Sequence, residues 1–221
     1  MKSSLPNPLA GMFFDLDGTL VDSAPDLHEA LVALCREREI KAPEYETVRA
    51  VTSRGARAIV STAFGDQGEN VVEAVMPRFI ELYVDTGTAR TQPFPGMEAL
   101  LGKLESRGIP WGVITNKAGF LTAPLLERLG YAGRVAAVVA GDTLAVRKPH
   151  PDPVLLACTQ AGVEPAGCVF VGDDPRDVQA GQAAGLRTIV AGWGYLDPED
   201  ARGWGAEAYA EHAEQIAGWL D

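Results

Sequence analysis

Near the N-terminus, a short apolar segment ends in two closely spaced carboxylates, in the sequence FDLDGTLVDS. Met12, Phe13 and Phe14 are apolar and predict a buried strand. Asp15 and Asp17 then stand two residues apart, where this strand should end. Two carboxylates at that spacing repel each other, and each loses hydration if it is buried. The segment therefore predicts a strand whose end faces a positive charge.

Four further apolar segments end in polar or glycine-containing turns: IPWGVITNK, VAAVVAGD, GCVFVGDD and LRTIVAGWG. Their length and β-branched residues indicate buried strands of about five residues. Between the segments lie the helical patterns GMEALLGKLESRG, FLTAPLLERLG, PDPVLLACTQAG and DVQAGQAAG. Alternating strands and helices with short connections predict an α/β fold with a doubly wound, Rossmann-like parallel sheet.

Residues 23–90 interrupt this alternation, because the segments there have a helical period and none contains a convincing strand. The segment GTARTQPFPGM, stiffened by Pro93 and Pro95, would return the chain to the sheet. We therefore expect an α/β core domain of residues 1–22 and 91–221. Residues 23–90 should form a small helical cap domain, inserted after the first strand.

Polar side chains follow four of the five predicted strands. In an open parallel sheet, ligands bind at the carboxyl ends of the strands. No single member of the set is specific, but the ordered combination rarely arises by chance. In chain order the set is Asp15 and Asp17, then Thr115 and Asn116, then Lys148, and finally Asp173, Asp174 and Asp177.

This ordered set resembles the haloacid dehalogenase (HAD) superfamily of phosphatases over essentially the whole chain. The four signatures of that superfamily correspond to DLDGT, VITN, the lysine of KPHPDP, and GDDPRD. The helical insert, DGTLVDSAPDL and FVGDDPRDVQAGQAAG are typical of its phosphoglycolate phosphatase-like branch. Within that branch, SRGARAIVSTAFG and PGMEALLGKLESRGIPWGVITNK look most similar to bacterial N-acetylmuramic acid 6-phosphate phosphatases.

The resemblance implies a Mg²⁺-dependent phosphomonoester hydrolase that acts through an aspartyl-phosphate intermediate. Asp15 would be the nucleophile, and Asp17 would serve in turn as general acid and general base. Asp15 and Asp173 would give carboxylates to Mg²⁺, and Asp17 its backbone carbonyl, because Mg²⁺ prefers oxygen ligands. Asp177 would act on the metal through water, or would hold Lys148.

The phosphate group would be bound by several groups around these carboxylates. Lys148 adds positive charge, Thr115 can donate its hydroxyl and Asn116 its backbone N–H. Gly18 would let the backbone approach the phosphate closely. Two alternatives stay open: Thr115 could also be a helix N-cap, and Asp174 could either ligate the metal or merely occupy the turn after its strand.

A polar TSRG break in the cap could face the active site with Ser53, Arg54 and Arg57. An arginine there, Arg54 foremost, could bind a substrate carboxylate through two parallel hydrogen bonds. A solvated helix end is an equally weighted alternative. Both N-acetylmuramic acid 6-phosphate and 2-phosphoglycolate carry a carboxylate, and the cap resemblance slightly favours the sugar phosphate.

Three other functions stay open as alternatives. A sugar phosphomutase of the β-phosphoglucomutase type would use the same first and fourth signatures but would keep its phospho-enzyme from water. A haloacid dehalogenase is disfavoured, because that chemistry has no use for the second aspartate or a metal. A catalytically inactive binding module is disfavoured because every catalytic position is filled.

Composition limits the partners. The chain has 30 acidic and 19 basic residues and a formal net charge of −11, which argues against nucleic acid or an anionic membrane. Cys35, Cys158 and Cys168 have neither a disulfide pattern nor metal-ligand spacing and indicate thiols in a reducing cytosol. No segment approaches the ~20 apolar residues of a membrane span, and the N-terminus does not resemble a signal peptide. We expect a cytoplasmic monomer or homodimer acting on a small phosphate ester.

Overall fold

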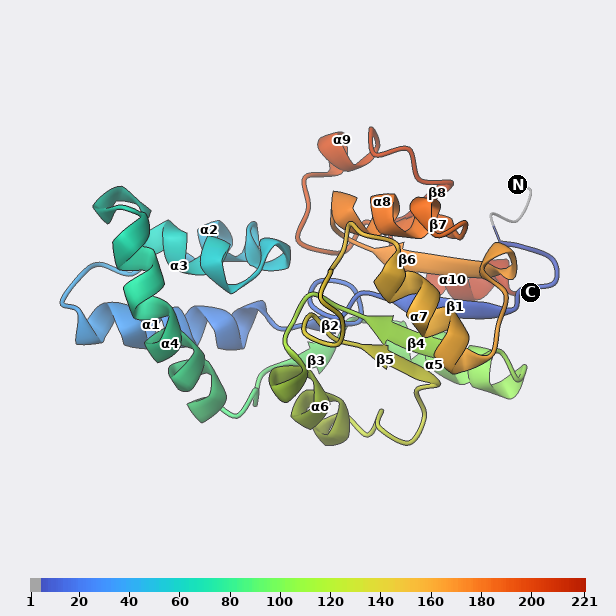
Figure 1. Cartoon of the computed structure of the whole chain (residues 1–221), viewed down its shortest axis with the longest axis horizontal. Coiled ribbons are helices and arrows are strands. Elements are labelled where there is room, and N and C mark those ends of the chain that lie inside the picture. Colours follow the sequence, from blue (N-terminus) through green and yellow to red (C-terminus); the bar gives the residue numbers. More distant parts are fainter. Residues whose placement is uncertain (1–4) are drawn as a thin grey trace.

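Six parallel strands form the central sheet of the computed structural model, which describes residues 5–221 (Figure 1). This confirms the doubly wound α/β fold, and the five predicted segments all supply strands. The sixth strand, β8, was not predicted because its short AYA sequence has no apolar run. In sheet order the strands are β5 (Ala137–Val139), β4 (Trp111–Ile114), β1 (Gly11–Phe14), β6 (Cys168–Gly172), β7 (Arg187–Ala191) and β8 (Ala208–Ala210).

Helices cover both faces of the sheet, and four of the five that pack on it match the predicted helical patterns; the fifth, the C-terminal helix α10, was not predicted. The α7 pattern, for example, ends at Ala161 because Gly162 adopts a left-handed conformation. The helices that pack on the sheet are α5 (Met97–Ser106), α6 (Gly119–Arg128), α7 (Asp152–Ala161), α8 (Pro175–Ala183) and α10 (Ala213–Trp219). The connections contain two further short helices, η3 (Pro165–Gly167) and α9 (Pro198–Ala201).

Strand side chains alternate between two hydrophobic clusters, one on each face of the sheet. Phe13 and Phe170 pack with α7 and α8, whereas Met12 and Phe14 pack with α5, α6 and α10. All four side chains are at most 1% exposed. Burying side chains of this size stabilises the fold by roughly 1.5–3 kcal/mol each. The rigid sheet that results fixes the positions of the residues that follow its strands.

The first four helices form a separate lobe beside the sheet, at the left of Figure 1. They have their own hydrophobic cluster, in which Leu31, Leu34, Val60 and Phe79 are fully buried. The lobe consists of α1 (Ala24–Glu37), α2 (Tyr45–Arg49), η1 (Thr52–Arg54), α3 (Ala56–Phe64), η2 (Gly65–Gln67) and α4 (Glu69–Asp85). We call this lobe the cap and the remainder the core.

Two chain connections join the cap to the core, and they lie side by side. The short strands β2 (Val21–Asp22) and β3 (Gln92–Pro93) pair antiparallel. Just beyond them, the buried Asp26 carboxylate accepts hydrogen bonds from the backbone N–H groups of Arg90 and Thr91 and from the Thr91 hydroxyl. The domain boundaries at 22/23 and 90/91 stay a prediction, and residues 1–4 of the expected core lie outside the described residues.

Candidate active site

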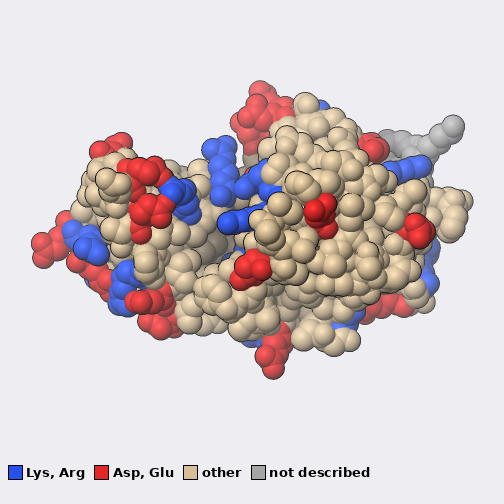
Figure 2. Space-filling view, viewed as in Figure 1, with Lys and Arg blue, Asp and Glu red and all other residues tan. Residues whose placement is uncertain are grey.

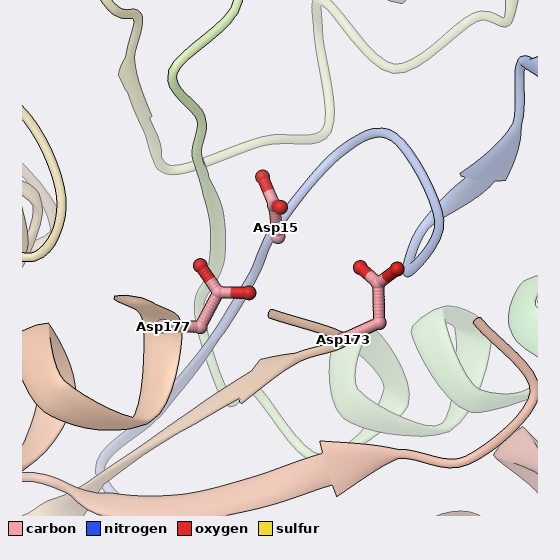
Figure 3. Close-up of side chains that lie close together, drawn as sticks. All are labelled: Asp15, Asp173 and Asp177. Carbon is pink, nitrogen blue, oxygen red and sulfur yellow. The ribbon is translucent and has the colours of Figure 1, made fainter. Parts of the chain in front are cut away.

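Three buried aspartates gather at the carboxyl ends of the central strands (Figure 3). Asp15 follows β1, Asp173 follows β6, and Asp177 lies in the first turn of α8. Each offers a carboxylate oxygen, and these three oxygens all lie within 4.8 Å of one another. The structure thus brings together the side chains of Asp15, Asp173 and Asp177, whereas the fourth expected metal residue, Asp17, was expected to offer its backbone carbonyl.

Lys148 supplies the positive charge that the opening segment predicted. Its Nζ lies 2.8 Å from Asp15 Oδ1 and 2.7 Å from Asp177 Oδ1, and it donates a hydrogen bond to the Ile114 carbonyl. The contact with Asp177 lacks hydrogen-bond geometry and is an ion pair alone. Burial opposes the charge of Lys148, but its two carboxylate neighbours outweigh burial and raise its pKa. Of the two roles expected for Asp177, this geometry matches the one of holding Lys148.

One lysine does not balance three buried carboxylates. Burial raises the pKa of Asp15 despite Lys148, and it raises the pKa of Asp177 well above its ordinary value. Burial and the charge of Asp15 raise the pKa of Asp173 to about 7. A divalent cation would offset this excess of negative charge, and three carboxylate oxygens are ligands that a hard cation prefers. The side chains present therefore fit a divalent metal ion.

Asp17 is the fourth expected metal residue. Its carboxylate forms hydrogen bonds with residues outside this cluster. It accepts a hydrogen bond of 2.5 Å from the Ser23 hydroxyl. Lys117 Nζ donates to both of its oxygens, at 3.1 and 3.2 Å. The carboxyl group is thus separated from the three clustered aspartates. That its backbone carbonyl faces the metal stays a prediction.

Thr115 and Asn116 follow β4 and border the cluster. Thr115 does not cap α6, which begins at Gly119; its hydroxyl accepts a hydrogen bond from the Lys117 N–H instead. The Asn116 side chain exchanges two 3.1 Å hydrogen bonds with the backbone of Lys148 and so fixes the loop that carries it. The Asn116 backbone N–H donates to no residue in the described range, so it is available to a ligand.

The structure explains the glycine at position 18 by a contact other than the expected one with phosphate. Its φ is +90°, a conformation that side chains rarely adopt. A Cβ atom at this position would collide with the Asp173 carboxylate. The absence of a side chain therefore makes room for Asp173; direct binding of phosphate by Gly18 stays a prediction.

The structure places Asp174 in the turn after its strand, and its role toward a metal stays a prediction. Asp174 is the N-cap of α8, where its carboxylate accepts the Arg176 backbone N–H at 2.9 Å. The Arg176 guanidinium also binds both carboxylate oxygens, at 2.7 and 2.8 Å. Asp177 completes a reciprocal capping box by accepting the Asp174 N–H. With both oxygens so occupied, Asp174 lies outside the metal cluster.

The polar TSRG segment of the cap faces the site. Ser53, Arg54 and Arg57, the three residues singled out there, have different contacts. The Ser53 hydroxyl donates to Asp173 at 2.5 Å, and the Ser53 carbonyl accepts a hydrogen bond from Arg176. Arg57 forms ion pairs with two glutamates of α4. The Arg54 side chain is exposed, and its guanidinium has no ion pair or hydrogen bond with any residue from 5 to 221. Arg54 is therefore the cap arginine that is available to a ligand.

A cavity of about 510 Å³ lies between cap and core, and two of the clustered aspartates, Asp15 and Asp177, line it. Figure 2 shows lysine and arginine side chains gathered around the hollow between the two lobes. The basic residues that line the cavity are Arg54, Arg57, Lys117, Arg147, Lys148 and Arg176. Part of the remaining wall is apolar, from Leu27, Ile59, Met76, Ile80, Phe120 and Leu121. The cavity thus combines an acidic floor, a basic rim and an apolar wall.

Four residues of this site were missed by sequence reasoning: Tyr83, Lys117, Arg147 and Arg176. Two carried a usable signal, because Lys117 directly follows the VITN strand end and Arg176 lies inside GDDPRD. Arg147 precedes Lys148 and resembles any loop arginine. Tyr83 belongs to an ordinary helical pattern, and its contact with the core depends on how the cap is placed.

Comparison with known proteins agrees with this geometry. A family model described as haloacid dehalogenase-like hydrolase matches residues 12–191. A phosphoglycolate phosphatase of Xanthomonas campestris is 41% identical over 206 residues, covering 93% of each chain. An N-acetylmuramic acid 6-phosphate phosphatase of Pseudomonas aeruginosa is 38% identical over 217 residues, covering 96% of this chain and 95% of its own.

A crystal structure described as a predicted phosphoglycolate phosphatase, from Haemophilus somnus, superposes with a TM-score of 0.86. It is 24% identical and covers 96% of this chain and 98% of its own, so it supports the fold alone. Across residues 5–221, no helix is both long and apolar enough to span a membrane.

Proposed function

The chain belongs to the haloacid dehalogenase-like hydrolase family and is a phosphoric monoester hydrolase, and we propose that it acts through an aspartyl-phosphate on Asp15. The observation that carries this proposal is the asymmetry of the Asp15 carboxylate. Its Oδ1 is held by the Leu16 N–H at 2.7 Å and by Lys148 at 2.8 Å. Its Oδ2 accepts no hydrogen bond from residues 5–221, which leaves one oxygen free to attack phosphorus.

The reaction then proceeds in two balanced steps. In the first, Asp15 Oδ2 attacks phosphorus, the bond to the leaving oxygen breaks, and Asp17 gives that oxygen its proton. In the second, water attacks the aspartyl-phosphate, Asp17 takes a proton from the water, and the bond between phosphorus and Asp15 breaks. Inorganic phosphate leaves, and both aspartates return to their starting states.

The remaining residues bind the phosphate and hold the metal. Lys148, the Thr115 hydroxyl and the Asn116 N–H would stabilise charge on the phosphate oxygens. We propose Mg²⁺ as the metal, held by Asp15, Asp173 and the Asp17 backbone carbonyl, with Asp177 acting through water or through Lys148. When bound, Mg²⁺ supplies positive charge to the phosphate oxygens and offsets the three buried carboxylates.

For the substrate, we propose N-acetylmuramic acid 6-phosphate ahead of 2-phosphoglycolate; both names occur among the relatives. A cavity of about 510 Å³ with an apolar wall suits a substituted sugar. Phosphoglycolate has only two carbons and would leave that wall uncovered. The unpaired Arg54 could bind the carboxylate that both compounds carry.

We place the reaction in the cytoplasm, with a small phosphate ester as partner and neither nucleic acid nor membrane involved. The formal net charge of −11 supports the exclusions. Free, buried thiols at Cys35, Cys158 and Cys168 support a reducing compartment.

The test is phosphate release from three compounds in the presence of Mg²⁺. We expect turnover of N-acetylmuramic acid 6-phosphate with the highest kcat/KM. N-Acetylglucosamine 6-phosphate, which lacks the carboxylate, should be ~10–100-fold poorer, because a charge-assisted hydrogen bond is lost. A preference for 2-phosphoglycolate would reverse the substrate order. Turnover of none of the three would overturn the function, and an isomerised sugar phosphate with a long-lived phospho-enzyme would indicate a mutase.

A further inference from the structure

Lys117 makes a buried contact between the two lobes that the proposed reaction does not yet use. It belongs to the core loop between β4 and α6, whereas Tyr83 lies near the end of α4 in the cap. Lys117 Nζ donates to Asp17 Oδ1 and Oδ2, at 3.1 and 3.2 Å. It also donates to the Tyr83 hydroxyl at 3.0 Å and lies 4.6 Å from the centre of that ring. One ammonium group therefore joins the proposed acid and base to the cap.

The contact excludes most solvent. The Lys117 side chain is 7% exposed and that of Asp17 16%, and Tyr83 is 1% exposed. Bringing a lysine into such a place is costly unless its charge and its hydrogen bonds are satisfied. Here they are, because an ammonium has three N–H donors and three acceptor oxygens lie within reach. Removing any one of the three partners would leave a buried donor unpaired.

This saturation separates Lys117 from Arg54, another basic residue of the cavity. The Arg54 guanidinium has no partner among residues 5–221 and can bind a substrate anion. Lys117 also lines the cavity, yet all its donors are already used inside the protein. Binding of a substrate anion by Lys117 would require breaking one of these bonds. The contacts of Lys117 therefore suit the positioning of another side chain better than the binding of a substrate anion.

Among residues 5–221, the Asp17 side chain that it holds has only one other hydrogen-bond partner. The Ser23 hydroxyl donates to Asp17 Oδ1, and Ser23 lies at the start of the cap, next to α1. Lys117 is the group that contacts both carboxylate oxygens and so fixes the rotation of the carboxyl plane. A proton donor must be aligned with its acceptor, and an error of about 1 Å can cost about 10²-fold in rate.

We propose that Lys117 is a positioning residue for Asp17, and that its bond to Tyr83 makes the correct orientation of Asp17 depend on the closed cap. The inference rests on the phosphatase function proposed above. With the cap closed, Tyr83 takes the third donor of Lys117, and the other two hold the Asp17 carboxyl. When the cap moves away, Tyr83 leaves, water replaces it, and Lys117 is free to turn from Asp17. Proton transfer is thereby favoured in the closed, water-poor site.

The first experiment measures kcat and KM of three single variants. Lys117→Met keeps the chain length and removes the charge; we expect kcat to fall about 30–100-fold with KM within about 3-fold. Tyr83→Phe keeps the ring and removes the hydroxyl, and we expect a fall in kcat of about 3–10-fold. Lys41→Met alters an exposed lysine of the cap outside the cavity and should leave both constants unchanged.

The second experiment is a double-mutant cycle with Asp17→Asn. If Lys117 acts through Asp17, adding Lys117→Met to Asp17→Asn should lower kcat by less than about 3-fold further. A merely structural role would instead lower kcat by the same factor in both backgrounds. Circular dichroism and thermal unfolding check that each variant is folded. Should Lys117→Met not fold, the cycle of Tyr83→Phe with Asp17→Asn tests the same coupling.

The outcomes separate this inference from the proposed function. Additive penalties, or an increase in KM without loss of kcat, would overturn the positioning role while wild-type turnover left the phosphatase intact. A wild-type protein inactive on every phosphomonoester would overturn the proposed function and, with it, this inference. A kcat loss for Lys117→Met that disappears in the Asp17→Asn background supports it.

Discussion

The core side of the cavity, which is its floor, and the cap side, which is its roof, differ in how their charged side chains are paired. On the floor, Asp15, Asp177 and Lys148 are almost fully buried, and each has a charged neighbour within 3 Å in the core. On the roof, Arg54 is exposed and unpaired among the described residues. The floor is built from strand ends of a rigid sheet, and the roof from the short η1 turn of a separate lobe.

This difference indicates a division of work. Groups that are fixed before the substrate arrives can stabilise a charge distribution without rearranging, which suits the reaction itself. A group that is solvated and free can adapt to the part of the substrate that does not react, which suits selection. The bonds that tie the cap to the core include Ser53 to Asp173, the Ser53 carbonyl to Arg176, and Tyr83 to Lys117, and the Arg54 guanidinium takes part in none of them. Floor variants should therefore change kcat, and variants of the unpaired Arg54 should change KM, whereas Tyr83 affects kcat through Lys117.

The largest effect is expected on the floor, for Asp15→Asn. The carboxamide is a poor nucleophile, so turnover should fall by about 10⁴-fold or more. Phosphate release from the preferred substrate measures the loss, and thermal unfolding checks the fold. Asp66→Asn, at an exposed cap position, is the matched control and should keep full activity. Activity near the control level would show that Asp15 is not the nucleophile.

Asp17→Asn comes next, since Asp17 belongs to the floor but contacts the roof through Lys117. A general acid and base contributes about 10²–10⁴-fold, and we expect kcat to fall by that factor with the fold kept. Steady-state kinetics at several pH values measure the effect. Near-full activity in this variant would show that Asp17 is not the general acid and base. The proposed difference in role between the Asp17 and Asp15 carboxyl groups would then not hold.

On the roof, Arg54→Met should raise KM for a carboxylate-bearing substrate by about 10-fold, because a charge-assisted hydrogen bond is lost. With p-nitrophenyl phosphate, which has no carboxylate, the same variant should behave as wild type. Arg57→Met is the matched control, because Arg57 is already paired with Glu69 and Glu73. Equal effects of both variants, or a loss confined to kcat, would contradict the division between floor and roof.

The smallest effect concerns the stability of the metal-free protein. Burial and Asp15 raise the pKa of Asp173 to about 7 from an ordinary value near 3.8, so the folded state binds this proton more tightly than the unfolded state. The resulting stability is fully present below about pH 4 and is lost as the pH rises through about 7. In EDTA, Tm should fall by a few degrees between pH 5 and pH 8.

Two comparisons sharpen that measurement. Asp173→Asn carries no titrating carboxyl and should show a flatter dependence of Tm on pH in EDTA. Excess Mg²⁺, the metal proposed above, should bind the carboxylate form and flatten the dependence for the wild type as well. A Tm that rises with pH in EDTA would contradict the sign of the Asp173 shift.

The sequence was informative where local pattern and position suffice. The apolar run before Asp15 predicts a strand, and parallel strands present their carboxyl ends on one edge, so Asp15, Lys148 and Asp173 could be expected together. Gly18 was singled out for its approach to phosphate, which stays a prediction, but its need to avoid Asp173 was not foreseen, because that clash joins residues 155 positions apart in the chain. Proximity of that kind is not encoded in either local segment.

The cap contacts were hidden for the same physical reason. A helical period indicates that α4 buries one face, but not that Tyr83 at its end meets a lysine of the core. Ser53 and Arg57 lie four residues apart in one polar stretch, yet Ser53 bonds Asp173 and Arg57 pairs within the cap. The different contacts of Ser53 and Arg57 are set by how the cap is placed against the core.

The pairing of β2 with β3 has a mechanical consequence. Two separate tethers would let the cap twist as well as tilt, whereas two tethers bonded to each other, and clamped again by Asp26, behave as a single joint. If the cap opens as proposed for Lys117, we expect such a joint to favour a single rotation. Tyr83 and Arg54 would then return to the same positions at each closure, guided by a ladder only two residues long.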